Sequence, residues 1–243
     1  MKRPRIIATA LAVMAVALLA GRAMGSIGGS KHDFADPKQY PTNWSNGQIC
    51  APCHAPHNTT PTATDGGELS GPLWNHTLPT NSYKMYISTD IKDANGNKLY
   101  TAELVTAGQQ VDTNSILCLS CHDGTVALDS FGGTSATAGT SVGPISGNAN
   151  FGNDLSNDHP IGAAAIWTDV SYMVPQSARD AAGIMPIRKM ADGSKAVGCT
   201  SCHEPHNRKS TKHMLWVAND QAGTTVDGRS VTGSVLCLNC HKK

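Results

Sequence analysis

Aromatic side chains are scarce in this sequence. Phe, Trp and Tyr together form only 5% of the 243 residues, whereas glycine alone occurs 24 times. A chain of this length normally fills one or two domains with large apolar side chains, and this composition is poor material for such a core. The sequence therefore predicts that something other than its own side chains fills much of the interior.

Long apolar runs are also scarce. The one run that approaches the length of a membrane span covers residues 6–20, after three basic residues and before a stretch of small ones. Its fifteen residues fall short of the roughly 20 that cross a bilayer. The layout is typical of a secretory signal peptide, and we expect cleavage after Gly25 and export of the protein. An uncleaved membrane anchor is the alternative.

Neither sign of charge dominates the sequence. The formal net charge is +1, and the predicted signal peptide contains four basic residues and no acidic one, so its removal leaves −3. No stretch is basic in the way that nucleic-acid-binding surfaces require. The composition therefore excludes nucleic acid as a partner.

No cysteine stands alone. All eight lie in pairs separated by two residues, and a histidine directly follows each pair: Cys50, Cys53 and His54; Cys118, Cys121 and His122; Cys199, Cys202 and His203; Cys237, Cys240 and His241. This is the attachment pattern of c-type haem. Two thioethers reach the vinyl groups on one porphyrin edge, and the next residue turns its imidazole to the iron. The motifs predict four covalent haem c groups, whose apolar faces would also fill the interior.

Three other interpretations of the cysteine pairs are open. Structural zinc also uses Cys-x-x-Cys, but it does not require a histidine after every pair. A thioredoxin-like redox pair would need one motif between a strand and a helix, not four scattered copies. Disulfides are the third alternative in an exported protein. The histidine after all four pairs favours haem.

The four motifs form an internal repeat in the order A-B-A-B. The first and third continue as Cys-His-x-Pro-His-Asn, whereas Ser-x-Leu precedes the second and fourth. Each half also holds a Leu-Trp pair between its motifs, at 73–74 and 215–216, and we align these pairs. The predicted organisation is a signal peptide at 1–25, a first two-haem module at 26–130, a Gly- and Ser-rich irregular insert at 131–190 that carries His159, and a second two-haem module at 191–243.

Little regular secondary structure is expected. The predicted fold is mostly coil with short helices and few strands, with helical turns at the haem tethers. A helix is predicted over residues 175–182, where Pro175 suits the first helical position and Gly183 a stop. Short strands are predicted at 83–87 and 99–105. Residues 131–154 are predicted to form an irregular surface loop.

Histidines outside the motifs are candidates for the sixth iron ligand. The motif histidines are the proximal ligands, and full bis-histidine coordination needs four more. The chain offers six: His32, His57, His76, His159, His206 and His213. This surplus favours two imidazoles on every iron, which is typical of electron transfer and leaves no vacant position for a substrate. We therefore expect no enzymatic activity.

Four of these histidines are the favoured distal ligands. His57 and His206 come three residues after a proximal histidine, and a loop so short does not easily reach both faces of its own haem. Each is therefore expected to bind the iron of a neighbouring haem. His76 and His159 lie in turn-rich sequence; the alignment places Ala218 opposite His76, so His159 compensates for a missing counterpart. Solvated or hydrogen-bonded surface positions are the alternative for all four.

The remaining candidates are weaker. His213 follows a basic run and is expected to be exposed. His32 lies near the mature N-terminus, in a segment that could fold back to a haem, reach another subunit or stay free. Methionine ligands would raise the potential of a haem. Because histidines are in surplus, we do not expect methionine ligation.

Several phrases of the sequence resemble a known family. Cys-x-x-Cys-His-x-Pro-His-Asn, Gly-Pro-Leu-Trp-Asn-His, Leu-Cys-Leu-Ser-Cys-His-Asp-Gly-Thr-Val-Ala and Asn-Asp-His-Pro resemble the doubled-motif multihaem cytochromes exported by metal-reducing bacteria, especially the tetrahaem, filament-forming outer-surface type. The resemblance implies a multihaem cytochrome c fold organised around a stacked chain of four haems. It also implies a head-to-tail homopolymer in which a histidine of one subunit completes a haem of the next, with His57 and His32 as candidates.

The expected function is electron transfer. At the outer surface or outside the cell, the protein would pass electrons to other multihaem cytochromes or to extracellular acceptors such as metal oxides. A soluble periplasmic tetrahaem shuttle is the alternative. A multihaem reductase is a third, and it would need one iron with an open position beside acid–base groups.

Overall fold

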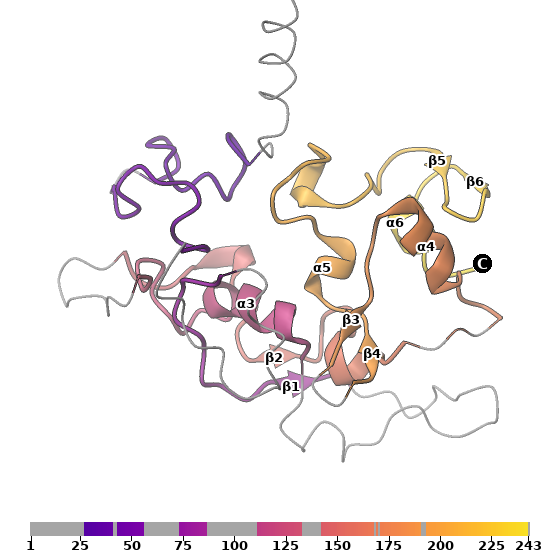
Figure 1. The fold of residues 1–243 in the computed structure, drawn as a ribbon, viewed down its shortest axis with the longest axis horizontal. Helices are drawn as coiled ribbons and strands as arrows, with labels where there is room; N and C mark the ends of the chain where they lie inside the picture. The colour runs from indigo at the N-terminus through magenta and orange to yellow at the C-terminus, as the bar shows by residue number, and fades with distance from the viewer. Residues whose placement is uncertain are drawn as a thin grey trace, which may run out of the picture.

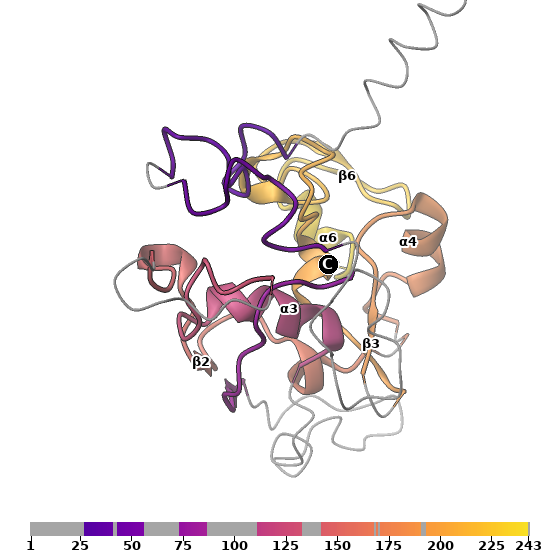
Figure 2. The same ribbon diagram turned by 60° about the vertical axis from the view of Figure 1, so that its left-hand side comes forward.

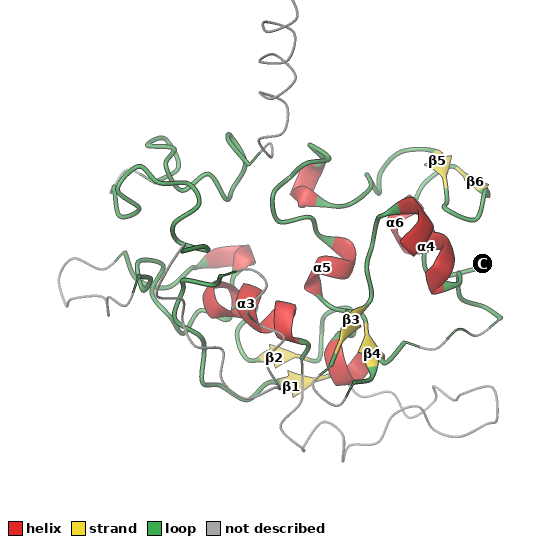
Figure 3. Ribbon diagram, viewed as in Figure 1, coloured by secondary structure: helices red, strands yellow, loops and turns green. Residues whose placement is uncertain are grey.

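Loops and turns make up most of the chain. The computed structural model describes residues 27–40, 43–55, 73–86, 111–132, 142–167, 169, 171–190 and 193–242. The prediction of a mostly coiled chain with short helices and few strands is confirmed for these residues, as Figure 3 shows. The predicted signal peptide, the predicted strand at 99–105 and His57 lie outside the described residues. No described helix combines the length and the apolar character needed to cross a membrane.

The helices are short, and three of the four α-helices lie at Cys-x-x-Cys-His motifs (Figure 1). The α-helices of the described residues are α3 (Thr113–His122), α4 (Gln176–Ala182), α5 (Cys199–Cys202) and α6 (Val235–Leu238). The 3₁₀ helices are η2 (Gly147–Ala149), η3 (Gly162–Ala165) and η4 (Lys212–Met214). Three of the four α-helices contain cysteines of the motifs, which confirms the prediction of helical turns at the tethers.

The strands are two residues long and form three separate pairs in the described part. They are β1 (Lys84–Met85), β2 (Asp154–Leu155), β3 (Arg188–Lys189), β4 (Lys195–Ala196), β5 (Gly223–Thr224) and β6 (Ser230–Val231). β1 pairs with β2 in parallel, whereas β3–β4 and β5–β6 are antiparallel. The strand predicted at 83–87 is present only as β1. The predicted irregular loop at 131–154 contains η2 and ends at the first residue of β2.

Helix α4 begins and ends as its sequence requires. Pro175, predicted as the first helical residue, is the N-cap instead, and the helix begins one position later at Gln176. Gly183 ends it in the left-handed conformation (φ 63°), which glycine adopts without a Cβ clash, and donates its N–H to the carbonyl oxygens of Arg179 and Asp180.

Two small aliphatic clusters replace a conventional core. In the larger, Tyr83, Met85 and Leu155 of the β1–β2 region pack against Leu119 of α3 and Ala164 of η3. The smaller consists of Ala163, Met190 and Ala196. The larger cluster fastens α3 to β1, β2 and η3.

The N-terminal segment is held by an aromatic cluster. Phe34, Tyr40 and Trp44 contact one another with ring centroids 5.2–5.9 Å apart, and Trp44 also meets the edge of Phe131 at 5.9 Å. The cluster contains four of the twelve aromatic residues of the chain. It holds residues 27–40 against the rest of the molecule, so that this segment lies beside residues of the second half (Figure 2).

The two halves fold alike around their A motifs. His54 forms a β-bridge with Trp74, and His203 forms the same antiparallel bridge with Leu215. The structural counterpart of Trp74 is therefore Leu215, not Trp216. The alignment of the two Leu-Trp pairs is wrong by one residue, because backbone hydrogen bonding rather than side-chain identity fixes the register.

Two further observations support this corrected register. Leu73 and Met214, which become counterparts, both have positive φ angles of 50° and 55°. The side chains of Asn75 and Trp216 each donate a hydrogen bond to the carbonyl oxygen of the residue after the first cysteine of the motif, at 2.5 Å and 2.8 Å. The side-chain amide of Asn75 thus makes the same hydrogen bond in the first half that the indole of Trp216 makes in the second.

Candidate functional site

Each motif presents its two cysteines and its histidine from a single turn of chain. In the first, third and fourth motifs the histidine N–H donates to the carbonyl oxygen of the first cysteine, at 2.8–3.0 Å. In the second motif the same residues lie on the last turn of α3. The spacing of four residues brings the first cysteine and the histidine to one side of the turn. The backbone therefore provides the geometry that two thioethers and one axial imidazole require.

The eight thiols form no disulfide with one another, and burial affects the ionisation of several of them. All eight cysteines lie in the described residues, and none forms a disulfide. Burial raises the pKa of Cys53, Cys121 and Cys202 to about 12. These three thiols are therefore protonated at neutral pH, whereas a hydrogen bond with Cys118 lowers the pKa of Cys199. Among the residues that the structure describes, no three His, Cys, Asp or Glu side chains are arranged to hold a bare metal ion.

Backbone carbonyls orient two of the proximal histidines. His122 Nδ1 lies 2.8 Å from the carbonyl oxygen of Ala149, and His203 Nδ1 lies 2.9 Å from that of His213. A carbonyl accepts a hydrogen bond, so each imidazole carries its proton on Nδ1 and keeps the Nε2 lone pair free. Histidines that bind a metal are commonly oriented in this way, by a hydrogen bond from the ring nitrogen that does not bind the metal.

Three proximal histidines each face a histidine from a distant segment. The ring centroids are 6.0 Å apart for His54 and His206, 6.1 Å for His122 and His32, and 6.4 Å for His241 and His159. Two imidazoles bound to opposite sides of one iron, with iron–nitrogen distances near 2.0 Å, have centroids about 6.3 Å apart. The spacing of all three pairs fits one iron between each.

His206 belongs to the third motif but lies beside the histidine of the first. Its Nδ1 is 3.3 Å from the carboxylate of Glu204, which is itself buried. Burial opposes ionisation of Glu204, but hydrogen bonds from the backbone of Arg208 and His206 and the charge of Arg208 outweigh it and lower the pKa of Glu204. Glu204 thus holds the ring as an anionic partner. The sequence-equivalent position in the first half is Ala55.

His76 and His159 lie in different surroundings. The ring of His76 is 1% exposed, and its two nitrogens lie 3.0 Å and 3.1 Å from the carbonyl oxygens of Thr77 and Ala127. In the corrected register Val217, not Ala218, stands opposite His76, so the second half still lacks this histidine. His159 is exposed, and its Nδ1 contacts the carbonyl of Pro160 at 2.9 Å.

His32 and His213 lie at the third motif. The prediction that His213 is exposed is confirmed, and its backbone carbonyl orients His203. His32 lies against His122, and its Nδ1 is 3.2 Å from the carbonyl oxygen of Pro205. Burial lowers the pKa of His32 to about 4, so the imidazole is neutral at pH 7, the state that binds a metal.

The aromatic cluster that holds His32 was missed by sequence reasoning. The ring of His32 stacks on Phe34 at 5.8 Å, and Phe34 belongs to the cluster with Tyr40 and Trp44. The signal was available, because these residues concentrate a scarce residue type within the eleven positions 34–44. That concentration indicates a segment packed on the molecule rather than a free end.

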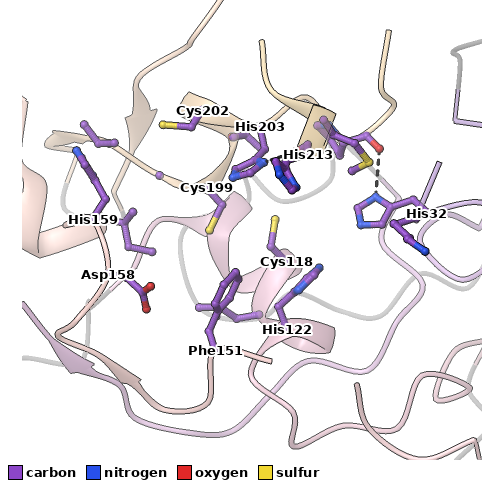
Figure 4. Close-up of a pocket in the computed structure, with 18 of the residues that line it drawn as sticks. His32, Cys118, His122, Phe151, Asp158, His159, Cys199, Cys202, His203 and His213 are labelled. Carbon is purple, nitrogen blue, oxygen red and sulfur yellow. Dashed lines mark hydrogen bonds between the residues drawn. The ribbon is translucent and has the colours of Figure 1, made fainter. Parts of the chain in front are cut away.

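A cavity of about 560 Å³ lies between the second and third motifs. Figure 4 shows Cys118 and His122 on one side, Cys199 and His203 on the other, with His32 and His159 toward opposite ends. Cofactor sites commonly have volumes of about 300–1,000 Å³. The cavity is therefore large enough for a macrocycle, and its lining contains the thiols and imidazoles that haem attachment uses.

A buried junction joins these two motifs below the cavity. Asp112 caps α3 by accepting hydrogen bonds from the N–H groups of Asn114 and Ser115, at 3.1 Å each. The Ser115 hydroxyl donates to Asp112 and accepts from the N–H of Cys199, the latter at 2.9 Å. Gly198 fits against this pair, since a Cβ there would lie 2.2 Å from Asp112 Oδ2. The junction fixes the second tether relative to the third.

Comparison with known proteins agrees with this geometry. A family model described as the doubled CXXCH motif matches residues 192–243, the stretch that contains the third and fourth motifs. No curated protein matches the chain. The match supports assignment to the multihaem c-type cytochromes, proteins that bind haem and transfer electrons, and it implies covalent attachment of c-type haem. The cysteines and paired imidazoles of the structure fit that cofactor.

Proposed function

We propose that the protein binds four c-type haems and transfers electrons among them. The observation that carries the proposal is the set of imidazole pairs, each combining a motif histidine with a distant histidine at 6.0–6.4 Å. Haem bound in this way supplies a one-electron ferric–ferrous couple. All four motifs share one local geometry, which supports four attachment sites rather than two.

The ligands follow from these pairs. Cys50, Cys53, His54 and His206 would hold one haem; Cys118, Cys121, His122 and His32 a second; and Cys237, Cys240, His241 and His159 another. Cys199, Cys202 and His203 would hold the remaining haem, with His57, His76 and His213 as candidates for its sixth ligand. Distant segments thus bind each other through the iron atoms, which explains how a chain with so small a core folds.

The arrangement favours electron transfer over catalysis. At the three motifs with paired histidines, an imidazole on each side of the iron would leave no position for a substrate, and a sixth ligand from the remaining candidates would close the third-motif haem in the same way. The chain's own part is to orient the rings, as the Ala149 and His213 carbonyls do, and to exclude water with the small aliphatic clusters. We therefore propose that the protein is not an enzyme.

The proposal also covers export of the protein and the partners that receive its electrons. The signal-like N-terminal sequence and the resemblance to filament-forming cytochromes support electron transfer to extracellular acceptors or other multihaem cytochromes, with a periplasmic shuttle as the alternative. The intrachain contact of His32 with His122 favours His57 over His32 as a ligand donated to the next subunit. Electron microscopy of the purified holoprotein tests this, because filaments support the polymer and discrete particles with six-coordinate iron support the shuttle.

Removal of a distal histidine tests the haem assignment. Mass spectrometry of the exported holoprotein should show four attached haems, and its electron paramagnetic resonance (EPR) spectrum should be low-spin. In His206→Ala about a quarter of the iron should become high-spin because one haem loses a strong-field ligand. Lys209→Ala, an exposed change in the same loop, should leave the spectrum unchanged. Fewer than four haems, or a His206→Ala spectrum identical to that of the wild type, contradicts the proposal.

A further inference from the structure

A buried cation lies at the fourth motif. Arg179 of α4 is 0% exposed. Its Nη1 donates to the carbonyl oxygen of Met185 at 3.2 Å and lies 3.6 Å from Cys240 Sγ. The guanidinium stacks over the Trp167 ring, 4.0 Å from its centroid. The positive charge therefore sits directly beside one of the two sulfurs that would attach the haem of this motif.

The charge is only partly compensated. Nε and Nη2 of Arg179 are buried and have no hydrogen-bond partner among the residues that the structure describes. Asp169 belongs to the same cluster, but its carboxylate accepts from the Trp167 indole N–H and from Gln176 N, at 3.0 Å each, and no ion pair with Arg179 is found among the described residues. Burial of a cation without a counter-ion is strongly unfavourable, and stacking on Trp167 offsets only part of this cost. A stabilising role therefore does not explain why the Arg179 guanidinium is buried at this position.

Among the described residues of the first half, no such charge contacts the equivalent sulfur. Cys121 is the counterpart of Cys240, and its Sγ lies 3.5 Å from Nε2 of His76. An imidazole thus stands where the second half has a guanidinium. Because arginine stays protonated in proteins at every relevant pH, the two B motifs differ in fixed charge at the same short distance from the thioether position.

We propose that Arg179 raises the reduction potential of the haem attached through Cys237 and Cys240 above that of the haem attached through Cys118 and Cys121. The inference rests on the proposed haem attachment. Uptake of one electron removes one positive charge from the haem, and a fixed cation nearby in a poorly polarisable interior favours the state with the smaller positive charge. Electrons that enter the chain from a neighbouring haem therefore collect at the fourth motif.

Potentials of individual haems in matched variants test the proposal. Redox titration of the holoprotein, followed by NMR signals assigned to each haem, is compared among the wild type, Arg179→Met, Arg179→Lys and Lys189→Gln. Arg179→Met keeps the apolar bulk and removes the charge. It should lower the reduced-to-oxidised ratio of the fourth-motif haem about tenfold at fixed applied potential, a shift of about 59 mV for one electron. Arg179→Lys should retain most of the wild-type potential, and Lys189→Gln, which removes an exposed cation of β3, should leave it unchanged.

The outcomes separate this proposal from the proposed function. Equal potentials in Arg179→Met and the wild type, with four haems attached in both, overturn the role of Arg179 alone, as does an equal shift in Arg179→Lys and Arg179→Met. If Arg179→Met fails to retain the fourth-motif haem, the order of reduction in the wild type decides, because that haem must be reduced before the second-motif haem. A wild-type protein with fewer than four haems contradicts the proposed function instead.

Discussion

The two B motifs share a sequence but differ in their helices. Ser-x-Leu-Cys-Leu-x-Cys-His lies in the ten-residue helix α3 in the first half and at the four-residue helix α6 in the second. Asp112 starts α3 by accepting two backbone hydrogen bonds. The N-cap of α6 is Ser234, which has a positive φ of 54° and makes no side-chain cap bond. Residues outside the motif therefore determine the length and the capping of the helix at each of these two motifs.

This difference shows which features the duplication preserved. The turn from first cysteine to histidine recurs in both halves, as expected if each turn attaches the same macrocycle. The supports have diverged: a capped helix, a junction with α5 and a neutral imidazole surround the second motif, whereas Arg179 and Trp167 surround the fourth. Identical tethers in unlike surroundings are the means by which one chain can give its haems different potentials.

The largest effect is expected from filling the space at the junction. Gly198→Ala would place a Cβ 2.2 Å from Asp112 Oδ2 and 2.9 Å from Ser115 Oγ, both in a buried network. Overpacking of this kind destabilises by about 3 kcal/mol. The free energy of unfolding of the holoprotein, from denaturant titration, measures it. Gly233→Ala in the second half meets no atom within 4 Å and should change stability by less than about 0.5 kcal/mol; equal stability of the two variants would show that the junction is not tightly packed.

Local chemistry made parts of the fold predictable from the sequence. The helix at 176–182 follows from Pro175 and Gly183, and the helical turns at the motifs follow from the spacing of the cysteines. The two-residue strands were not predictable in extent, because each pair consists of a few backbone hydrogen bonds, and β1 and β2 also lie far apart in sequence. The register of the repeat was missed for the same reason, since bonds to His54 and His203 fix it and the tryptophans do not.

The candidate site, like the fold, was predictable from the sequence only in part. The motif cysteines and histidines could be assigned from sequence, because covalent chemistry dictates their spacing. Which distant histidine faces which motif could not, since that depends on the path of the chain between them. His32 shows the gap: it was one of several ambiguous candidates until the packing of Phe34, Tyr40 and Trp44 placed it beside His122. Arg179 gave no sequence signal at all.

The next largest effect should come from removing the cap that distinguishes α3 from α6. Asp112→Ala deletes two backbone hydrogen bonds and leaves the Ser115 hydroxyl without its acceptor, so a loss of about 1.5 kcal/mol is expected. Asp112→Asn keeps an acceptor oxygen and should recover most of it. Ser234→Ala, at the uncapped counterpart, should be neutral within about 0.5 kcal/mol. Denaturant unfolding of the three variants provides the measurement, and an equal loss in Asp112→Ala and Ser234→Ala would contradict the role assigned to the cap.

The smallest effect concerns Glu204, which has Ala55 as its counterpart. Its folded pKa is lowered, so its contribution to stability is complete above the ordinary value of 4.5 and is lost as the pH falls through the lower folded value. Arg208 is exposed and solvent screens its charge, so Glu204→Gln should cost less than about 1 kcal/mol at neutral pH. In acid the difference in stability between Glu204→Gln and the wild type should vanish.

Glu204→Gln should also raise the reduction potential of the haem proposed between His54 and His206, because the anionic partner that makes His206 a stronger electron donor to iron is gone. Unfolding curves across this pH range and a redox titration give both readouts; a stability difference that persists below the folded pKa, or an unchanged potential, would show that Glu204 acts through packing alone.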